Sequence, residues 1–115
     1  MTAATQLNIS DREIARLERK ASHAAAVLKS ISNKWRLLIL CQLVKGEKSV
    51  GELLGVIDLS QSALSQHLAV LRAHKLVNTR RESQVIYYSI RGDEAPVILA
   101  ALYELYCAPP AAARA

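Results

Sequence analysis

Residues 60–91 read SQSALSQHLAVLRAHKLVNTRRESQVIYYSIR, and this stretch decides the fold. Ser60 can cap a helix that runs to about Lys75, because its hydroxyl oxygen can accept hydrogen bonds from the free N–H groups of a first helical turn. Three leucines recur in this helix at i, i+4 and i+7, a spacing that places them on one buried face. They are Leu64, Leu68 and Leu71. The stretch therefore predicts a helix with an apolar inner face and a small polar outer face.

Two β-like runs follow the helix, 76–81 and 85–91, and the polar segment 82–84 between them has hairpin length. Residues 60–91 contain five basic residues and one acidic residue, which gives a local net charge of +4. The whole chain carries +5, so most of its positive excess lies here. Such a balance favours a polyanionic partner such as nucleic acid. The charged residues are Arg72, Lys75, Arg80, Arg81, Arg91 and Glu82.

A short helix and a tight turn precede Ser60. Ser49 can cap a helix over 50–57, and Asp58-Leu59 forms the turn. A short helix, a brief turn and a longer helix with a small polar outer face are typical of a helix-turn-helix that reads DNA. We therefore predict that the outer side chains of the longer helix contact base edges and nearby phosphates. These side chains are Gln61, Ser62, Ser65 and Gln66.

The polar and basic residues beside the reading helix are expected at phosphates or in the minor groove. For any one of the arginines, a solvated surface charge is an equally good interpretation. Their clustering next to a helix-turn-helix pattern favours DNA for the group as a whole. The group consists of Arg72, Arg80, Arg81 and Gln84.

The segment before this unit is predicted to form a helix over 10–29. Ser10 and Glu13 match a capping box, and apolar residues then recur at alternating steps of three and four, as in a coiled coil. This seam suits a partner helix, with packing against its own domain as the alternative. The seam consists of Ile14, Leu17, Ala21, Ala24 and Leu28.

Two further helices complete the expected architecture. Asn33 can cap a helix that runs to about Lys45, and this helix is apolar on most sides, so it should lie centrally. A last helix should begin at Asp93 or Glu94 and end near Cys107, before two prolines that cannot continue it. The predicted fold is mainly α, with one β-hairpin.

Length and composition agree with one domain spanning 1–115, with flexible tails at 1–9 and 108–115. The chain is 51% hydrophobic but has no signal-peptide pattern and no run long enough for a membrane span. We therefore expect a cytoplasmic protein whose thiols are kept reduced. No phosphate loop, catalytic constellation or cofactor motif is visible, so the chain is not predicted to be an enzyme. A purely structural dimerisation module would explain the helical seam but not the basic hairpin.

The order of elements and several motifs resemble the ArsR-type winged-helix repressors. The similarity extends over about 31–107, and its most specific part is the helix 60–72 followed by Arg80-Arg81-x-x-x-x-Ile86-Tyr87-Tyr88. Residues 36–40, Arg-Leu-Leu-Ile-Leu, also fit. The resemblance implies a homodimer joined by its first and last helices, which binds an inverted-repeat operator in double-stranded DNA.

The metal-sensing motifs of that family are missing. Residues 49–53 contain no thiol or imidazole where soft-metal sensors carry a cysteine pair, and no histidine follows Asp93 where zinc sensors need one. The three histidines, His23, His67 and His74, are interpreted as structural or solvated. We expect no metal and no cofactor, and a metal-responsive repressor stays as an alternative.

The chain has only two cysteines, Cys41 and Cys107, which are too few for a disulfide scaffold. They could be inert core residues. Their positions resemble the thiol-sensing branch of the family, the BigR, SqrR and YgaV type, which senses persulfides and polysulfides and represses sulfide-detoxification genes. That resemblance implies a bridge of two or more sulfur atoms that lowers operator affinity. HlyU-type regulators share the pair and relieve repression, and peroxide or general redox signals are alternative inputs.

Overall fold

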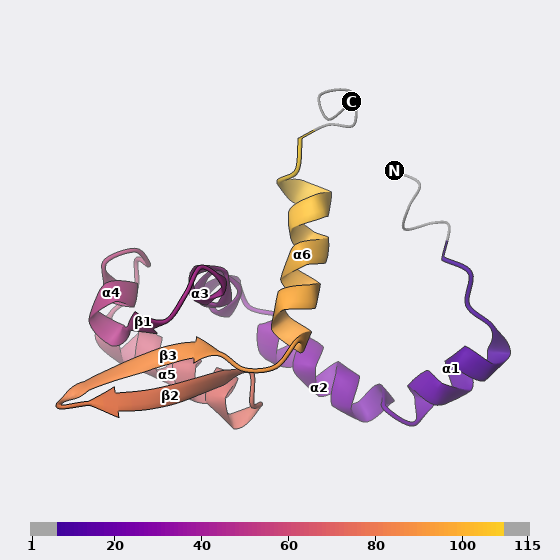
Figure 1. Cartoon of the computed structure of the whole chain (residues 1–115), viewed down its shortest axis with the longest axis horizontal. Coiled ribbons are helices and arrows are strands. Elements are labelled where there is room, and N and C mark those ends of the chain that lie inside the picture. The colour runs from indigo at the N-terminus through magenta and orange to yellow at the C-terminus, as the bar shows by residue number, and fades with distance from the viewer. Residues whose placement is uncertain (1–6, 110–115) are drawn as a thin grey trace.

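The computed structural model describes residues 7–109, so the predicted tails lie partly outside it. Within that range, residues 7–9 and 108–109 belong to no helix or strand. The elements are α1 (Asp11–Glu18), α2 (Ala21–Ile31), α3 (Lys34–Val44), β1 (Lys48–Ser49), α4 (Val50–Leu54), α5 (Gln61–Ala73), β2 (Val77–Glu82), β3 (Val85–Ile90) and α6 (Glu94–Tyr106). This order, shown in Figure 1, confirms the predicted mainly helical fold with one hairpin.

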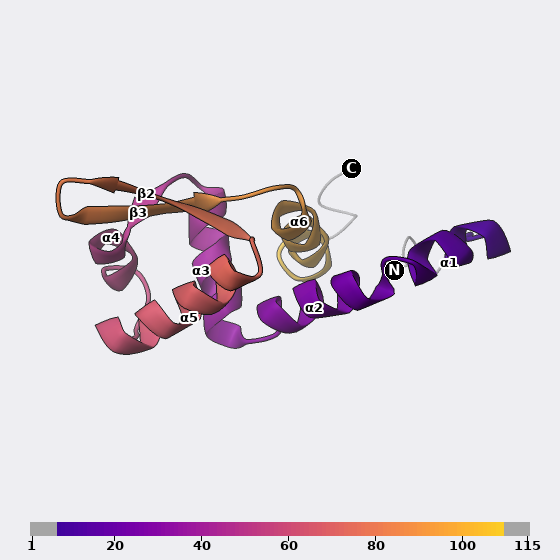
Figure 2. The ribbon, with the colours of Figure 1, turned by 90° about the horizontal axis from the view of Figure 1, so that it is seen from below.

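The core lies where α3, α4 and α5 pack against one face of the hairpin (Figure 2). The three leucines predicted to face inward from α5 are all 0% exposed, which confirms the predicted stripe. Ile39, Leu40 and Leu43 of α3 are also buried, as expected for a central helix. Asn33 caps α3 by accepting hydrogen bonds from two backbone N–H groups, and Gly46 follows it with a φ of 146°.

The sheet has three antiparallel strands in the order β1-β3-β2. β2 and β3 form a tight hairpin in which Glu82 pairs with Val85, and Ser83 in the turn adopts a φ of 58°. The two-residue strand β1 was not predicted from the sequence, because its only signal is its pairing with β3, about 40 residues later. Through β1, the hairpin is joined to the segment that leads directly into α4.

Two predicted helices end differently in the structure. The expected continuous helix over 10–29 is wrong, since the chain breaks at Arg19 and Lys20 into α1 and α2. No residue of α1 is buried, so packing among residues 7–109 does not keep the two helices in line. The helix expected over 50–57 ends at Leu54, because Gly55, a poor helix former, stands at its C-cap.

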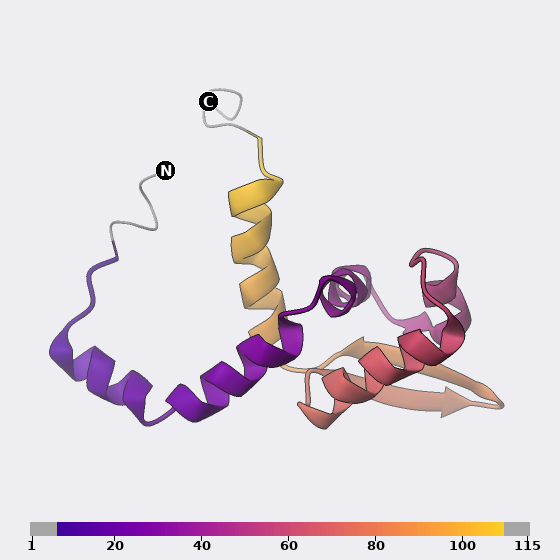
Figure 3. The same cartoon turned by 180° about the vertical axis from the view of Figure 1, so that it is seen from behind.

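Helices α1 and α6 extend away from this body (Figures 1 and 3). The radius of gyration is 16.7 Å, compared with about 13 Å for a compact domain of this length. Apolar side chains on the extended helices are solvent-exposed, among them Leu17 at 54% on α1, Leu28 at 55% on α2 and Val97 at 66% on α6. In the single chain, the seam residues Leu17 and Leu28 therefore do not pack on their own domain, contrary to the alternative considered above.

Candidate nucleic-acid interface and thiol pair

Helix α5 presents the predicted reading side chains to solvent. The Ser60 hydroxyl accepts a hydrogen bond from the backbone N–H of Ala63 at 3.2 Å, which starts the helix where it was expected to start. Because the leucine stripe faces the core, the opposite side of the helix must face outward. Its polar residues Gln61, Ser62, Ser65 and Gln66 are all exposed.

The hairpin lies beside this helix and is the wing of a winged helix (Figure 3). A groove runs between the N-terminal part of α4, the first half of α5 and the hairpin. Gln61 and Ser65 line it from α5, and Gln84 lines it from the hairpin turn. A second groove on α5 contains Ser65 and Arg72 next to Tyr88 of β3. Together the two grooves contain four of the eight predicted DNA-contacting residues.

The two neighbouring arginines of β2 face opposite sides of the hairpin. Side chains directly opposite each other on paired strands share a face, and successive residues alternate between faces. Arg81 pairs with Ile86, which lines the groove beside α5, so Arg81 faces the reading side. Arg80 pairs with Tyr87 and faces the other side. Arg81 donates only to the Ser83 carbonyl at 3.1 Å and pairs with no carboxylate among residues 7–109.

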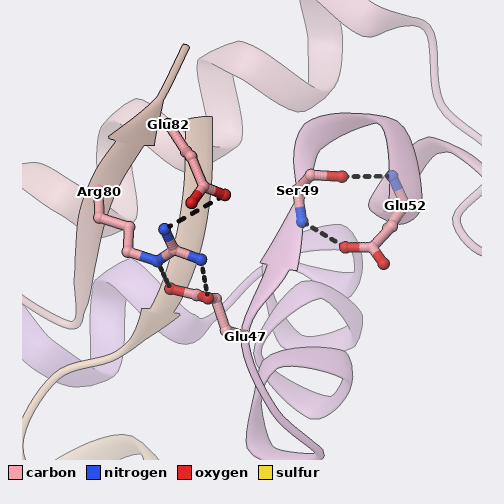
Figure 4. Close-up of polar contacts among 5 residues, drawn as sticks. All are labelled: Glu47, Ser49, Glu52, Arg80 and Glu82. Carbon is pink, nitrogen blue, oxygen red and sulfur yellow. Dashed lines mark hydrogen bonds and ion pairs between the residues drawn. The ribbon is translucent and has the colours of Figure 1, made fainter. Parts of the chain in front are cut away.

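Arg80 is held by two carboxylates (Figure 4) and also contacts an aromatic ring. Its Nε and Nη2 donate to the two carboxylate oxygens of Glu47 at 2.8 and 2.9 Å, and Glu82 lies 3.8 Å from Nη1. The guanidinium also lies over the Tyr87 ring, 4.4 Å from its centroid. The hydrogen bonds to Glu47 raise the pKa of Arg80. Arg80 was expected to contact phosphate, but Glu47 competes with phosphate for its guanidinium, and no local pattern in the sequence indicates this contact.

A half-buried hydrogen-bond network connects α3 to α5. Arg36 on α3 donates from Nε to the Ser30 carbonyl at 2.5 Å, and its Nη1 lies 3.3 Å from Nδ1 of His67 on α5. Burial, and then the charge of Arg36, lower the pKa of His67. A neutral imidazole with its proton on Nε2 can accept from Arg36 at Nδ1. His67 thus has the structural role that the sequence suggested.

The other histidines do not form a metal site with their neighbours. Nε2 of His23 on α2 lies 2.7 Å from Glu94 at the start of α6, which links these two helices. His74 is the C-cap of α5. Among residues 7–109, no three histidine, cysteine, aspartate or glutamate side chains gather into a possible metal-binding group.

Both cysteines are free thiols with exposed side chains, so neither is a core residue of the single chain. Cys41 on α3 lines a groove together with Val44 and, from α6, Ala100 and Tyr103. Cys107 is the C-cap of α6, one turn beyond Tyr103, and its backbone N–H donates to the Tyr103 carbonyl at 2.8 Å. Burial raises the pKa of the Cys41 thiol, and the charge of a Cys107 thiolate raises it further. Because α3 packs against α6, the fold brings the helix that carries Cys41 against the helix that ends at Cys107, 66 residues later in the sequence.

Comparison with known proteins identifies the family. The family model described as "Bacterial regulatory protein, arsR family" matches residues 33–79. The transcriptional activator HlyU of Vibrio cholerae is 47% identical over 91 residues, which cover 79% of this chain and 84% of that protein. The chain belongs to the ArsR family.

Other relatives agree. The biofilm growth-associated repressor of Agrobacterium fabrum is 41% identical, over 90% of this chain and 88% of that protein. The crystal structure of the transcriptional repressor BigR from Xylella fastidiosa is also 41% identical and superposes with a TM-score of 0.78, covering 83% of this chain and 97% of that one. This ArsR-family chain is thus a transcriptional regulator with a winged helix-turn-helix. Within residues 7–109, no helix is both long and apolar enough to span a bilayer.

Proposed function

We propose that this ArsR-family regulator is a homodimeric repressor whose affinity for operator DNA falls when reactive sulfur species bridge Cys41 and Cys107. The observation that carries the proposal is the thiol pair itself. Both thiols are exposed, and they belong to α3 and to the end of α6, two helices that pack against each other in a DNA-binding fold. The chain has no other cysteine that could compete for the sulfur donor.

The DNA-binding part of the proposal rests on the surface formed by α5 and the wing. In a helix-turn-helix, the second helix enters the major groove, and glutamine is suited to pair with adenine there. Gln61 and Gln66 are exposed on α5 and can serve as base readers, with Ser62 and Ser65 beside them. Arg81, with no carboxylate partner among residues 7–109, is the best candidate for a phosphate contact from the wing.

The dimer is proposed from the extended helices. Their exposed apolar side chains are not covered by any other part of residues 7–109, and an open apolar groove runs between α2 and α6 beside Val27, Leu28 and Val97. A second copy that covers these surfaces would follow the two-fold symmetry of most homodimers. Two reading helices related in this way would require an inverted repeat with half-sites about one DNA turn apart.

The chemistry begins at Cys107 in this proposal. Because its pKa is raised, more of Cys41 is in the protonated thiol form, which is less reactive than the thiolate. Cys107 is also exposed and lies at the end of α6. The Cys107 thiolate attacks the outer sulfur of a persulfide, R–S–SH, takes up that sulfur and releases R–S⁻. The Cys41 thiolate then attacks the Cys107 sulfur, forms the disulfide and releases HS⁻. If a second donor first adds one sulfur to Cys41, the same closure gives a three-sulfur bridge, which relaxes the distance that a plain disulfide demands.

Helix α3 offers the physical connection between the bridge and the DNA. It carries Cys41 in the half that faces α6, and it carries Arg36, which contacts His67 on α5, in the other half. A bridge that shifts α3 relative to α6 would therefore also shift the support of the reading helix. A coupling free energy of about 1–3 kcal/mol would weaken operator binding about 5- to 150-fold.

The test is an anisotropy titration of duplex promoter DNA with reduced protein and with protein treated with glutathione persulfide. We expect tight binding that the donor weakens and a thiol reductant restores. The variant Cys41→Ser should trap one extra sulfur atom on Cys107, visible by mass spectrometry, and should keep its DNA affinity. Tight binding that is indifferent to the donor would refute the sulfur switch but keep the repressor, and metals would be tested next with the thiol-free double serine variant.

A second candidate function is relief of repression instead of repression. The relative from Vibrio cholerae is named a transcriptional activator, so relief of repression by another protein is a specific alternative. A reporter driven by the bound promoter distinguishes the two in a strain without other regulators of that promoter. A repressor lowers expression there, whereas an anti-repressor leaves it unchanged.

A further inference from the structure

The contacts of Arg80 join the two outer strands of the sheet. Arg80 lies on β2, and Glu47 directly precedes β1, with β3 between them. The Arg80 side chain reaches across β3, over the ring of Tyr87. Its Nε and Nη2 donate to the two oxygens of the Glu47 carboxylate (Figure 4). We call Glu47, Arg80 and Tyr87 the wing clamp.

The clamp connects the wing to the start of the helix-turn-helix. Glu47 is two residues before Ser49, which caps α4 by accepting from the Glu52 N–H at 3.1 Å while Glu52 accepts from the Ser49 N–H at 2.8 Å. This reciprocal box fixes the end of β1 to the first turn of α4. A wing held to Glu47 is therefore held to α4, the helix that packs against α5.

β2 pairs with β3 from Val77 to Glu82, but this pairing lies within the hairpin and does not attach the exposed end of the hairpin to the body. That end of the hairpin projects away from the body, and β1 pairs with β3 over only two residues. In the exposed half of β2, Arg80 is the residue that hydrogen-bonds to a part of the body outside the hairpin. Bidentate arginine–carboxylate pairs fix orientation as well as supplying energy.

We propose that Glu47 is a positioning residue for operator binding: through Arg80 it holds the wing, with Arg81 and Gln84, at a fixed place relative to the reading helix. This inference rests on the proposed DNA-binding function and is independent of the sulfur switch. Glu47 touches no DNA in this proposal, and its negative charge by itself opposes binding to phosphate.

Because of this negative charge, the two possible roles of Glu47 predict opposite changes in operator affinity when Glu47 is replaced. If Glu47 acts only as a charge, removing it raises the net charge by one and frees Arg80, so all duplex DNA should bind more tightly and with a steeper salt dependence. If Glu47 positions the wing, operator binding weakens instead, because a mobile wing must be ordered when DNA binds. Non-specific duplex does not require that register, so it should show only the charge effect.

The experiment compares Glu47→Gln with Glu82→Gln on two probes, an inverted-repeat duplex selected by the wild-type protein from a random library and an unrelated duplex. Glu82→Gln is the matched control, because it removes the same charge from the same neighbourhood but only a 3.8 Å contact with Arg80. We expect Glu47→Gln to lose about 3- to 5-fold in operator affinity for each wing, as befits a partly exposed ion pair. Non-specific affinity should rise or stay constant, and Glu82→Gln should weaken neither probe.

A double-mutant cycle separates positioning from a loss of stability. In an Arg80→Gln background, Glu47→Gln should cause no further loss of operator preference, since its partner is already absent. Unchanged thermal unfolding of the single variants would exclude partial unfolding as the cause. Glu47→Gln that binds operator as tightly as wild type, or more tightly, overturns the inference alone. Wild-type protein that binds no duplex overturns the proposed function and this inference with it.

Discussion

Arg81 should contribute a phosphate contact that Arg80 does not. It faces the α5 side of the wing and pairs with no carboxylate among residues 7–109, whereas Arg80 is occupied by Glu47 on the other face. The perturbation is Arg81→Ala. Because a phosphate contact carries no sequence information, the variant should weaken operator and unrelated duplex by a similar factor.

The magnitude follows from counterion release. One phosphate contact changes the slope of log affinity against log salt by about 0.9. Between 50 and 200 mM salt, a fourfold range, the loss of one contact therefore changes the ratio of wild-type to variant affinity by about 3.5-fold. The loss of the same contact from both wings of a dimer changes this ratio by about 12-fold. The loss caused by Arg81→Ala should thus be about 12 times larger at the lower salt concentration.

The assay is a set of anisotropy titrations at four or more salt concentrations, with Arg12→Ala as the control. Arg12 lies on α1 and its substitution removes the same charge, so it reports any effect of net charge alone. Arg81→Ala with the wild-type slope would refute the assignment of Arg81 to the DNA-facing side. A loss confined to the operator would refute the phosphate role and point to base or shape readout instead.

Three further outcomes are expected. Leu68→Ala removes a side chain that is 0% exposed in the core and should lower the unfolding free energy by about 2–5 kcal/mol in a urea titration. Ser49→Ala removes the side chain that caps α4 and should cost about 1 kcal/mol in the same measurement. Burial and the charge of Arg36 lower the pKa of His67, so the unfolded chain binds more protons below about pH 6.5 and the unfolding free energy should fall as the pH drops through that range toward the folded pKa. His67→Asn should flatten this acid dependence.

Local signals predicted most of the elements. Serine and asparagine caps start α1, α3, α4 and α5 where the sequence indicates, because a cap is an interaction between residues two or three apart. The leucine stripe of α5 is buried because helix periodicity alone fixes which residues share a face. The break between α1 and α2 was missed for the converse reason. No glycine or proline marks it, and only missing tertiary contact explains it.

The candidate site depends more on contacts between distant residues. The polar face of α5 was visible in the sequence, but the groove that joins Gln61 and Ser65 to Gln84 exists only because the hairpin folds back beside the helix. Likewise, the pairing of Cys41 with Cys107 was implied by resemblance and by no local pattern, because it requires that α3 packs against α6. The exposure of both cysteines shows that the alternative of inert core residues is wrong for the single chain.

A charge count along the chain therefore overstates what the wing offers to DNA. Strand alternation could have separated Arg80 from Arg81, since neighbours in a strand face opposite ways. It could not have shown that Glu47, 33 residues before Arg80, lies beside it and accepts hydrogen bonds from its Nε and Nη2. Arg80 and Arg81 carry the same charge, but Arg80 is bound to the body of the protein and Arg81 faces the reading side. Tertiary structure is therefore needed to distinguish the arginine proposed to orient the wing from the arginine proposed to contact a phosphate.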